Sequence, residues 1–138
     1  MAANDNTKTA AYENYPQNLL TKGSSPSAGV GPVTSGTYVA TTVNTADFDE
    51  LNLEADLIGG AADGDLGVSV FPIDAWGNVM PVPLNSVNAT GPKYNGPASG
   101  VFYQGLFDVS GQNAVQLRFT NNNAAAKNIA YSYKLTGD

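Results

Sequence analysis

The chain has 138 residues, a length that fits one domain with a hydrophobic core of its own. It contains no Cys and no His, which excludes Ser-His-Asp and Cys-His nucleophiles, the common zinc sites and thiol redox chemistry. The net charge is −6 and the six Lys and Arg are scattered, which argues against nucleic acid binding because phosphates are bound by clustered cations. We therefore predict a binding or structural protein, not an enzyme, with no metal and no cofactor.

The sequence also shows no segment for membrane insertion or export. No apolar run approaches the roughly 20 residues that a membrane helix needs, so no membrane is among the predicted partners. The first residues, Met-Ala-Ala-Asn-Asp-Asn, lack the basic and apolar regions of a secretion signal. We expect either a protein made and used in the cytoplasm or the mature part of an exported one.

Residues 1–35 are predicted to form a flexible or extended N-terminal arm. They are rich in Pro, Gly, Ser, Thr and Asn, a composition that buries too little apolar surface to offset the entropy of ordering. The large apolar side chains gather in one short stretch, at Tyr12, Tyr15, Leu19 and Leu20. The segment is either a solvating tail or an arm that binds a neighbouring subunit through these four partner-binding candidates. In both cases we expect its deletion to leave the stability of the folded domain nearly unchanged.

From residue 36 to residue 138 the pattern is that of a β-sandwich domain. Residues 37–43 are rich in Thr, Tyr and Val, which suit a pleated, half-buried surface. In residues 51–57, Leu and Ala alternate with polar residues, which predicts an antiparallel strand with one face on a core. The segments predicted as strands are 37–43, 51–57, 67–73, 79–84, 101–109, 114–120 and 128–135.

The segments between the predicted strands contain residues that indicate turns and loops. Residues 74–78 look like a hairpin turn, and the single Trp of the chain, Trp76, lies in it. Two prolines confine the following segment, 79–84, to an irregular or edge strand. Residues 85–100, with further Pro and Gly, are predicted to be a long loop, and residues 124–127 are compatible with one helical turn.

About seven strands separated by frequent turn signals predict an all-β fold, an antiparallel two-sheet β-sandwich. We describe the fold as jelly-roll-like, although the pattern leaves a jelly-roll and an immunoglobulin-like strand order both open. The predicted core consists of Leu51, Leu53, Leu57, Val115, Leu117, Phe119, Tyr131, Tyr133 and Leu135.

Eight carboxylates lie between residues 47 and 74, without one Lys or Arg among them. Such a cluster suits a pair of catalytic carboxylates for glycoside hydrolysis, a calcium site or a solvated face. Glu54 and Asp56 alternate with apolar residues and must point outward, which favours the solvated face. Calcium binding stays open, and Asp63-Gly64-Asp65 is predicted to be a turn, since Asp-Gly is a common tight-turn pair.

Aromatic side chains that are expected to be exposed are the other candidates for a binding site. Trp76 and Tyr94 are the residues that would stack on sugar rings, whereas the alternative for Trp76 is a place in the core or at a subunit contact. Apolar residues beyond those that one sandwich needs predict a homo-oligomer; they are Phe71, Trp76, Met80 and Phe102.

Three stretches of the predicted sandwich have a recognisable composition. They are VSVFPIDAWGN at residues 68–78, YQGLFDVSG at residues 103–111 and VQLRFTN at residues 115–121. In these stretches the chain resembles the small β-sandwich virion proteins of tailed bacteriophages, especially head decoration, or cement, proteins. The resemblance covers the sandwich, about three quarters of the chain.

The resemblance implies a structural virion protein that binds the outside of an assembled phage head, commonly as a homotrimer, and stabilises the joints between subunits of the major capsid protein. It implies synthesis in the host cytoplasm and a final location on the capsid surface. Trp76 joins the four arm residues as a candidate for partner binding. The alternative function is a non-catalytic carbohydrate-binding or cell-surface adhesion module, which would bind glycans through exposed aromatic residues.

Overall fold

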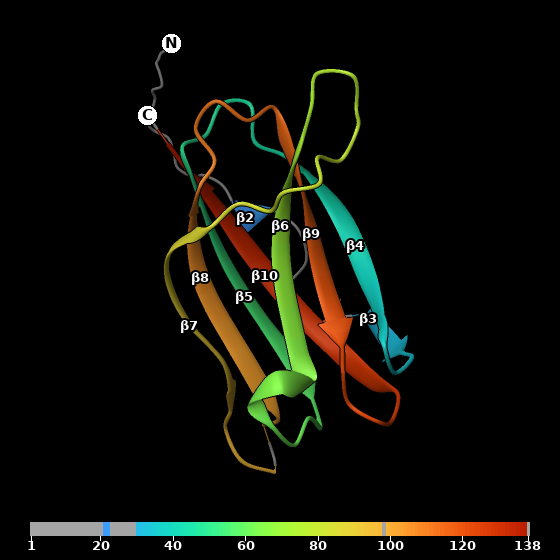
Figure 1. The fold of residues 1–138 in the computed structure, drawn as a ribbon. Coiled ribbons are helices and arrows are strands. Elements are labelled where there is room, and N and C mark those ends of the chain that lie inside the picture. Colours follow the sequence, from blue (N-terminus) through green and yellow to red (C-terminus); the bar gives the residue numbers. More distant parts are fainter. Residues whose placement is uncertain (1–20, 23–29, 98, 138) are drawn as a thin grey trace.

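The computed structural model describes residues 21–22, 30–97 and 99–137 as an all-β fold (Figure 1). The arm candidates Tyr12, Tyr15, Leu19 and Leu20 lie outside these residues. No helix in the described ranges is long and apolar enough to cross a membrane. The strands are β2 (Thr21–Lys22), β3 (Val30–Val33), β4 (Thr37–Asn44), β5 (Glu50–Ile58), β6 (Leu66–Ile73), β7 (Ser86–Tyr94), β8 (Val101–Asp108), β9 (Ala114–Asn121) and β10 (Lys127–Thr136), and the short 3₁₀ turn η2 spans Asp63–Asp65.

These strands form two antiparallel sheets. The larger has the order β2-β10-β5-β8-β7, with β3 also paired to β10, and the smaller has the order β4-β9-β6. The chain passes from one sheet to the other at every connection from β3 onward except the one between β7 and β8, which are neighbours in the larger sheet. The predicted all-β class and the two antiparallel sheets are confirmed.

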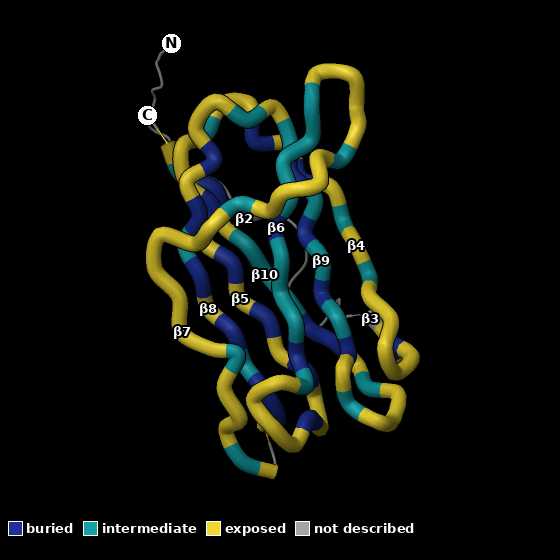
Figure 2. Tube along the Cα trace, viewed as in Figure 1, coloured by how far each residue is buried: buried dark blue, intermediate teal, exposed yellow. Residues whose placement is uncertain are grey.

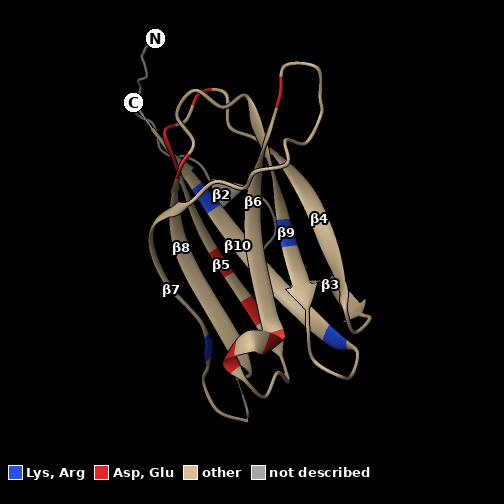
Figure 3. Cartoon of the chain, viewed as in Figure 1, with Lys and Arg blue, Asp and Glu red and all other residues tan. Residues whose placement is uncertain are grey.

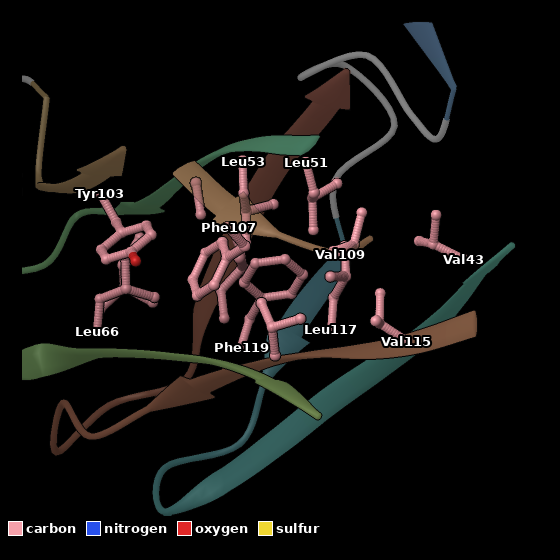
Figure 4. Close-up of a cluster of buried hydrophobic side chains, with 14 of the residues drawn as sticks. Val43, Leu51, Leu53, Leu66, Tyr103, Phe107, Val109, Val115, Leu117 and Phe119 are labelled. Carbon is pink, nitrogen blue, oxygen red and sulfur yellow. The ribbon is translucent and has the colours of Figure 1, made fainter. Parts of the chain in front are cut away.

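Side chains from both sheets meet in one core (Figure 4). In β5 every second residue is fully buried, including Leu53, while Glu54 and Asp56 are exposed, so the register predicted from the alternation is confirmed. Of the predicted core residues only Tyr131 and Tyr133 are half-buried, and both pack against the cluster. The buried apolar residues of the facing sheet are Val43, Leu66, Val70, Val115, Leu117 and Phe119.

The prediction of a loop over residues 85–100 is wrong, because β7 occupies most of it and pairs with β8. Nearly every residue of β7 is exposed, so neither face produces the alternation by which a strand is recognised. The register shifts twice, and the second shift follows Gly91, where a Cβ atom would approach the carbonyl oxygen of Phe102. Pairing with β8, not a buried face, makes this segment a strand.

The segment 79–84 runs irregularly beside β6, as its two prolines predict. Val79 forms a single bridge with Ile73, and the N–H groups of Met80 and Leu84 donate to the carbonyls of Pro72 and Val70, both across 2.8 Å. Only some residues of the segment therefore pair, which leaves it as a partial fourth row on the smaller sheet.

The strand β3 falls within residues 1–35. It pairs with β10, and Val33 is buried in the core. The amide of Asn121, itself fully buried, donates to the Val33 carbonyl across 2.8 Å. The end of this N-terminal segment therefore contributes to the packed fold.

Candidate partner-binding surface

The hairpin of residues 74–78 is fixed by the side chain of Asp74. One of its carboxylate oxygens accepts the N–H groups of Trp76 and Asn78 across 2.9 and 2.8 Å. The other accepts the Asn78 side-chain amide across 3.3 Å, and the Asp74 N–H donates to the Asn78 carbonyl across 2.9 Å. Gly77 has φ of +87°, in the left-handed region where glycine is favoured.

The hydrogen bonds that the Asp74 carboxylate accepts also act on its acidity. They lower the pKa of Asp74, with the Asn78 backbone bond as the largest cause. An aspartate is ionised at neutral pH in any case, and the lowered pKa means that these bonds stabilise the ionised form. Trp76 therefore lies at the tip of a turn whose backbone is held by hydrogen bonds to the Asp74 side chain.

Trp76 is 85% exposed and is the most exposed of the large apolar side chains in the described residues. Val82 and Met80, on the segment that returns from the hairpin, are 71% and 40% exposed. We call Trp76, Met80 and Val82 the Trp76 surface. The hairpin extends beyond the ends of the sheets, and its backbone is solvent-exposed around the tip (Figures 1 and 2). An exposed tryptophan that is carried by a rigid turn, with further exposed apolar side chains on the segment that follows, is typical of a site that another molecule covers.

The acidic residues are spread over several elements (Figure 3). Asp49, Glu50 and Asp108 line a hollow of about 510 Å³, in which Glu50 lies opposite Asp108 on the neighbouring strand. Within the described ranges, no three Asp or Glu side chains converge closely enough to hold a metal ion. The eight carboxylates therefore do not assemble into one ligand set.

Glu54 and Asp56 lie on the outer face of the larger sheet. Asp56 is exposed, but partial desolvation of its carboxylate, and next the neighbouring Glu54, raise its pKa. The nearest hollow on this face has a volume of about 240 Å³, and its lining contains no carboxylate: Asn52, Asn88, Ala89, Thr90, Gln104, Gly105 and Leu106. Neither hollow places a sugar between Glu54 and Asp56.

Asp63 and Asp65 are used within the fold. Asp65 accepts the N–H groups of Ala61 and Ala62 and, across 2.7 Å, the side-chain amide of Asn123. Asp63 accepts the N–H of Tyr94 across 2.7 Å. The predicted turn at Asp63-Gly64-Asp65 is confirmed as η2, and its two carboxylates fasten it to β7 and to the loop after β9.

Trp76 and Tyr94 do not form one platform. Tyr94 is bonded to η2, which precedes β6, whereas Trp76 follows the other end of β6. A strand of eight residues spans about 26 Å at the usual 3.3 Å per residue. The two aromatic rings therefore lie near opposite ends of the sandwich.

A stacked group on the outer face of the smaller sheet is not predictable from the sequence. The guanidinium carbon of Arg118 on β9 lies 4.3 Å from the ring centroid of Phe71 on β6 and 4.8 Å from that of Tyr38 on β4. Its Nε donates to the side-chain oxygen of Gln116 across 2.6 Å. Only the pairing of three strands brings these residues together, so spacing along the chain cannot reveal them.

No family model matches the chain, and neither a curated protein nor a solved structure matches it.

Proposed function

We propose that the chain is a structural virion protein that decorates the outside of an assembled phage head. The observation that carries the proposal is the Trp76 surface, in which a rigid hairpin holds Trp76 85% exposed. Covering an exposed tryptophan with a partner removes a large apolar area from water, and large aromatic residues are the usual anchors of protein interfaces. The major capsid protein is the proposed partner.

The strand order supports a jelly roll as the finer description of the fold. The rows β3-β10-β5-β8 and β4-β9-β6 face each other, and the segment 79–84 lies on the free side of β6. With that segment counted, the smaller sheet has four members and faces the row β3-β10-β5-β8, while β7 adds a further strand beside β8 and β2 also pairs with β10. Between these two rows of four, the chain crosses in the manner of two Greek keys. Jelly rolls are frequent in viral capsid proteins and also in lectins, so the fold agrees with the proposal and with its alternative.

Oligomerisation belongs to the same proposal. A homo-oligomer on the capsid would use several Trp76 surfaces at once, which raises the overall affinity without any new type of contact. The trimer implied by the resemblance stays a prediction, as does a contribution from Tyr12, Tyr15, Leu19 and Leu20.

Cosedimentation with capsids tests the proposed function. The purified chain is mixed with assembled heads of the phage whose genome encodes it, and with unassembled major capsid protein. We expect binding to the heads, in a fixed ratio to capsid subunits, and protection of the heads against heat. Absence of the chain from purified virions, together with no cosedimentation, would contradict the proposal.

The alternative is a carbohydrate-binding module, and the exposed indole of Trp76 is the observation that favours it. Because Trp76 is the single Trp of the chain, intrinsic fluorescence reports directly on its surroundings. A saturable change in fluorescence with oligosaccharides, at millimolar to micromolar concentrations, would support this alternative. No such change, combined with cosedimentation, would leave the capsid role.

A further inference from the structure

The edges of a β-sheet carry unpaired backbone groups, and natural proteins usually block them. Three edges of this molecule are blocked in the described ranges. The β7 edge is interrupted by two register shifts and contains a proline and a lysine. The free side of β6 is flanked by residues 79–84. The free side of β10 is covered by β2 and β3. The fourth edge, on β4, has no strand beside it in the described ranges.

The direction of the backbone groups of β4 follows from its register with β9. The N–H of Thr45 donates to the Asn113 carbonyl across 3.0 Å, in line with the β4–β9 register. Backbone groups alternate in direction along an antiparallel strand, so the odd-numbered residues of β4 bond to β9 and the even-numbered ones point away. We call these outward-directed residues the β4 edge; they are Tyr38, Ala40, Thr42 and Asn44.

The β4 edge has none of the usual protection. Its eight residues, TYVATTVN, include no charge and no proline, and they pair with β9 without a bulge. The ring of Tyr38 lies against Arg118, over the face of the sheet, so it does not shield the backbone. Val39 and Thr41, which face inward, are only half-buried. A long, regular, uncharged edge of this kind is a template for another strand.

We propose that the β4 edge pairs with the β4 edge of a second copy of this chain. Antiparallel pairing centred on Thr41 places Tyr38 opposite Asn44 and Ala40 opposite Thr42 of the second copy, so every outward N–H and carbonyl of the edge gains a partner. A twofold contact is self-complementary, as most soluble dimers are. The two smaller sheets join into one, and both Trp76 surfaces stay free.

The self-complementary register favours a second copy as the occupant, and charge does not oppose it. The chain has a net charge of −6, so two copies repel wherever their acidic surfaces meet, whereas β4 has no charged residue. A contact centred on β4 therefore brings no charged residue of one edge against the other. The inference is independent of the proposed function, and it predicts a dimer where the resemblance implies a trimer.

Sedimentation of the full chain tests the pairing. We expect wild-type protein to reach twice the 14.3 kDa mass of the chain at high micromolar concentration. The Thr42→Pro variant lacks an N–H that points away from β9. The Ala40→Lys variant places like charges beside the twofold axis of the pair. Both variants should sediment as monomers. Ala89→Lys, the same change on an exposed position of β7, should sediment as wild type does.

Amide hydrogen exchange of the wild-type protein gives a second measurement that needs no variant. The N–H groups of Ala40 and Thr42 should become protected as concentration rises and lose protection on dilution. A wild-type monomer with rapid exchange at both sites, a trimer, or a dimer that survives Thr42→Pro and Ala40→Lys would overturn the proposal. So would protection in a monomer that is lost when residues 1–20 are deleted, because that result would assign the edge to the N-terminal segment.

Discussion

Asn121 shows how one buried polar side chain can hold several loops. Its side-chain amide donates to the carbonyls of Val33 and Ala125, across 2.8 and 2.9 Å, and its side-chain oxygen accepts the N–H of Asn123 across 2.8 Å. These bonds fasten β3 to the turn between β9 and β10, and they hold residues 123–125 in a bend instead of a helical turn. The run Asn121-Asn122-Asn123 indicates a turn, but nothing in it shows which Asn is buried.

Replacing Asn121 with Ala should therefore destabilise the fold. Buried backbone partners that lose a hydrogen bond cost about 1–3 kcal/mol, and loss of the side chain adds a small cavity. Asn122→Ala is the matched control, because the Asn122 side chain donates an exposed bond, to the Gly64 carbonyl across 3.2 Å, while its backbone bond to Asp65 stays in the variant. Denaturant unfolding of both variants measures the difference. Equal free energies of unfolding would show that the Asn121 bonds contribute nothing net.

Among the elements, the 3₁₀ turn η2 contains a carboxylate that links the stability of the fold to acid. The bonds from Ala61, Asn123 and Ala62 lower the pKa of Asp65, and the Ala61 bond is the largest cause. A lowered pKa in the folded state stabilises the protein above the usual value of 3.8 and ceases to do so as pH falls through the folded value. Asp56, whose pKa is raised, acts in the opposite direction.

Asp65→Asn should for this reason flatten the acid side of the stability curve. Asn keeps an acceptor oxygen but does not titrate. The melting temperature of the variant should therefore fall less than that of wild type between about pH 5 and pH 2. The exposed Asp47→Asn is the control for the change in net charge. Parallel curves for wild type and Asp65→Asn would contradict the role given to this carboxylate.

The elements differ in how far the sequence predicts them. In β5 the alternation of apolar and polar residues fixes both the strand and its buried face, because one side of it packs on the core. In β7 both faces are exposed, so composition alone suggests a loop. The turn at residues 74–78 and the position of Trp76 in it are predictable from local signals, but the exposure of Trp76 depends on where the hairpin lies in the molecule.

For the whole molecule, β3 changes what is expected of N-terminal deletions. Composition predicts that removing residues 1–35 leaves stability nearly unchanged, yet this deletion removes the buried Val33 and an acceptor of Asn121. We now expect a loss of about 2–4 kcal/mol, from one buried aliphatic side chain and one buried hydrogen bond. Removing residues 1–20 keeps β2 and β3 and should leave the melting temperature close to that of wild type. Equal stability of both deletions would contradict this role of β3.

The proposed function requires docking through the Trp76 surface. The number of copies of the chain that bind to each assembled head measures this docking most directly. Trp76→Ala changes an exposed side chain and should leave the melting temperature unchanged, while the copies bound fall by at least tenfold, as for an interface anchor worth about 2 kcal/mol. Tyr94→Ala, near the opposite end of β6, is the control and should bind as wild type does. If the Trp76→Ala variant binds in the same number of copies per head as wild type, docking through the Trp76 surface is contradicted.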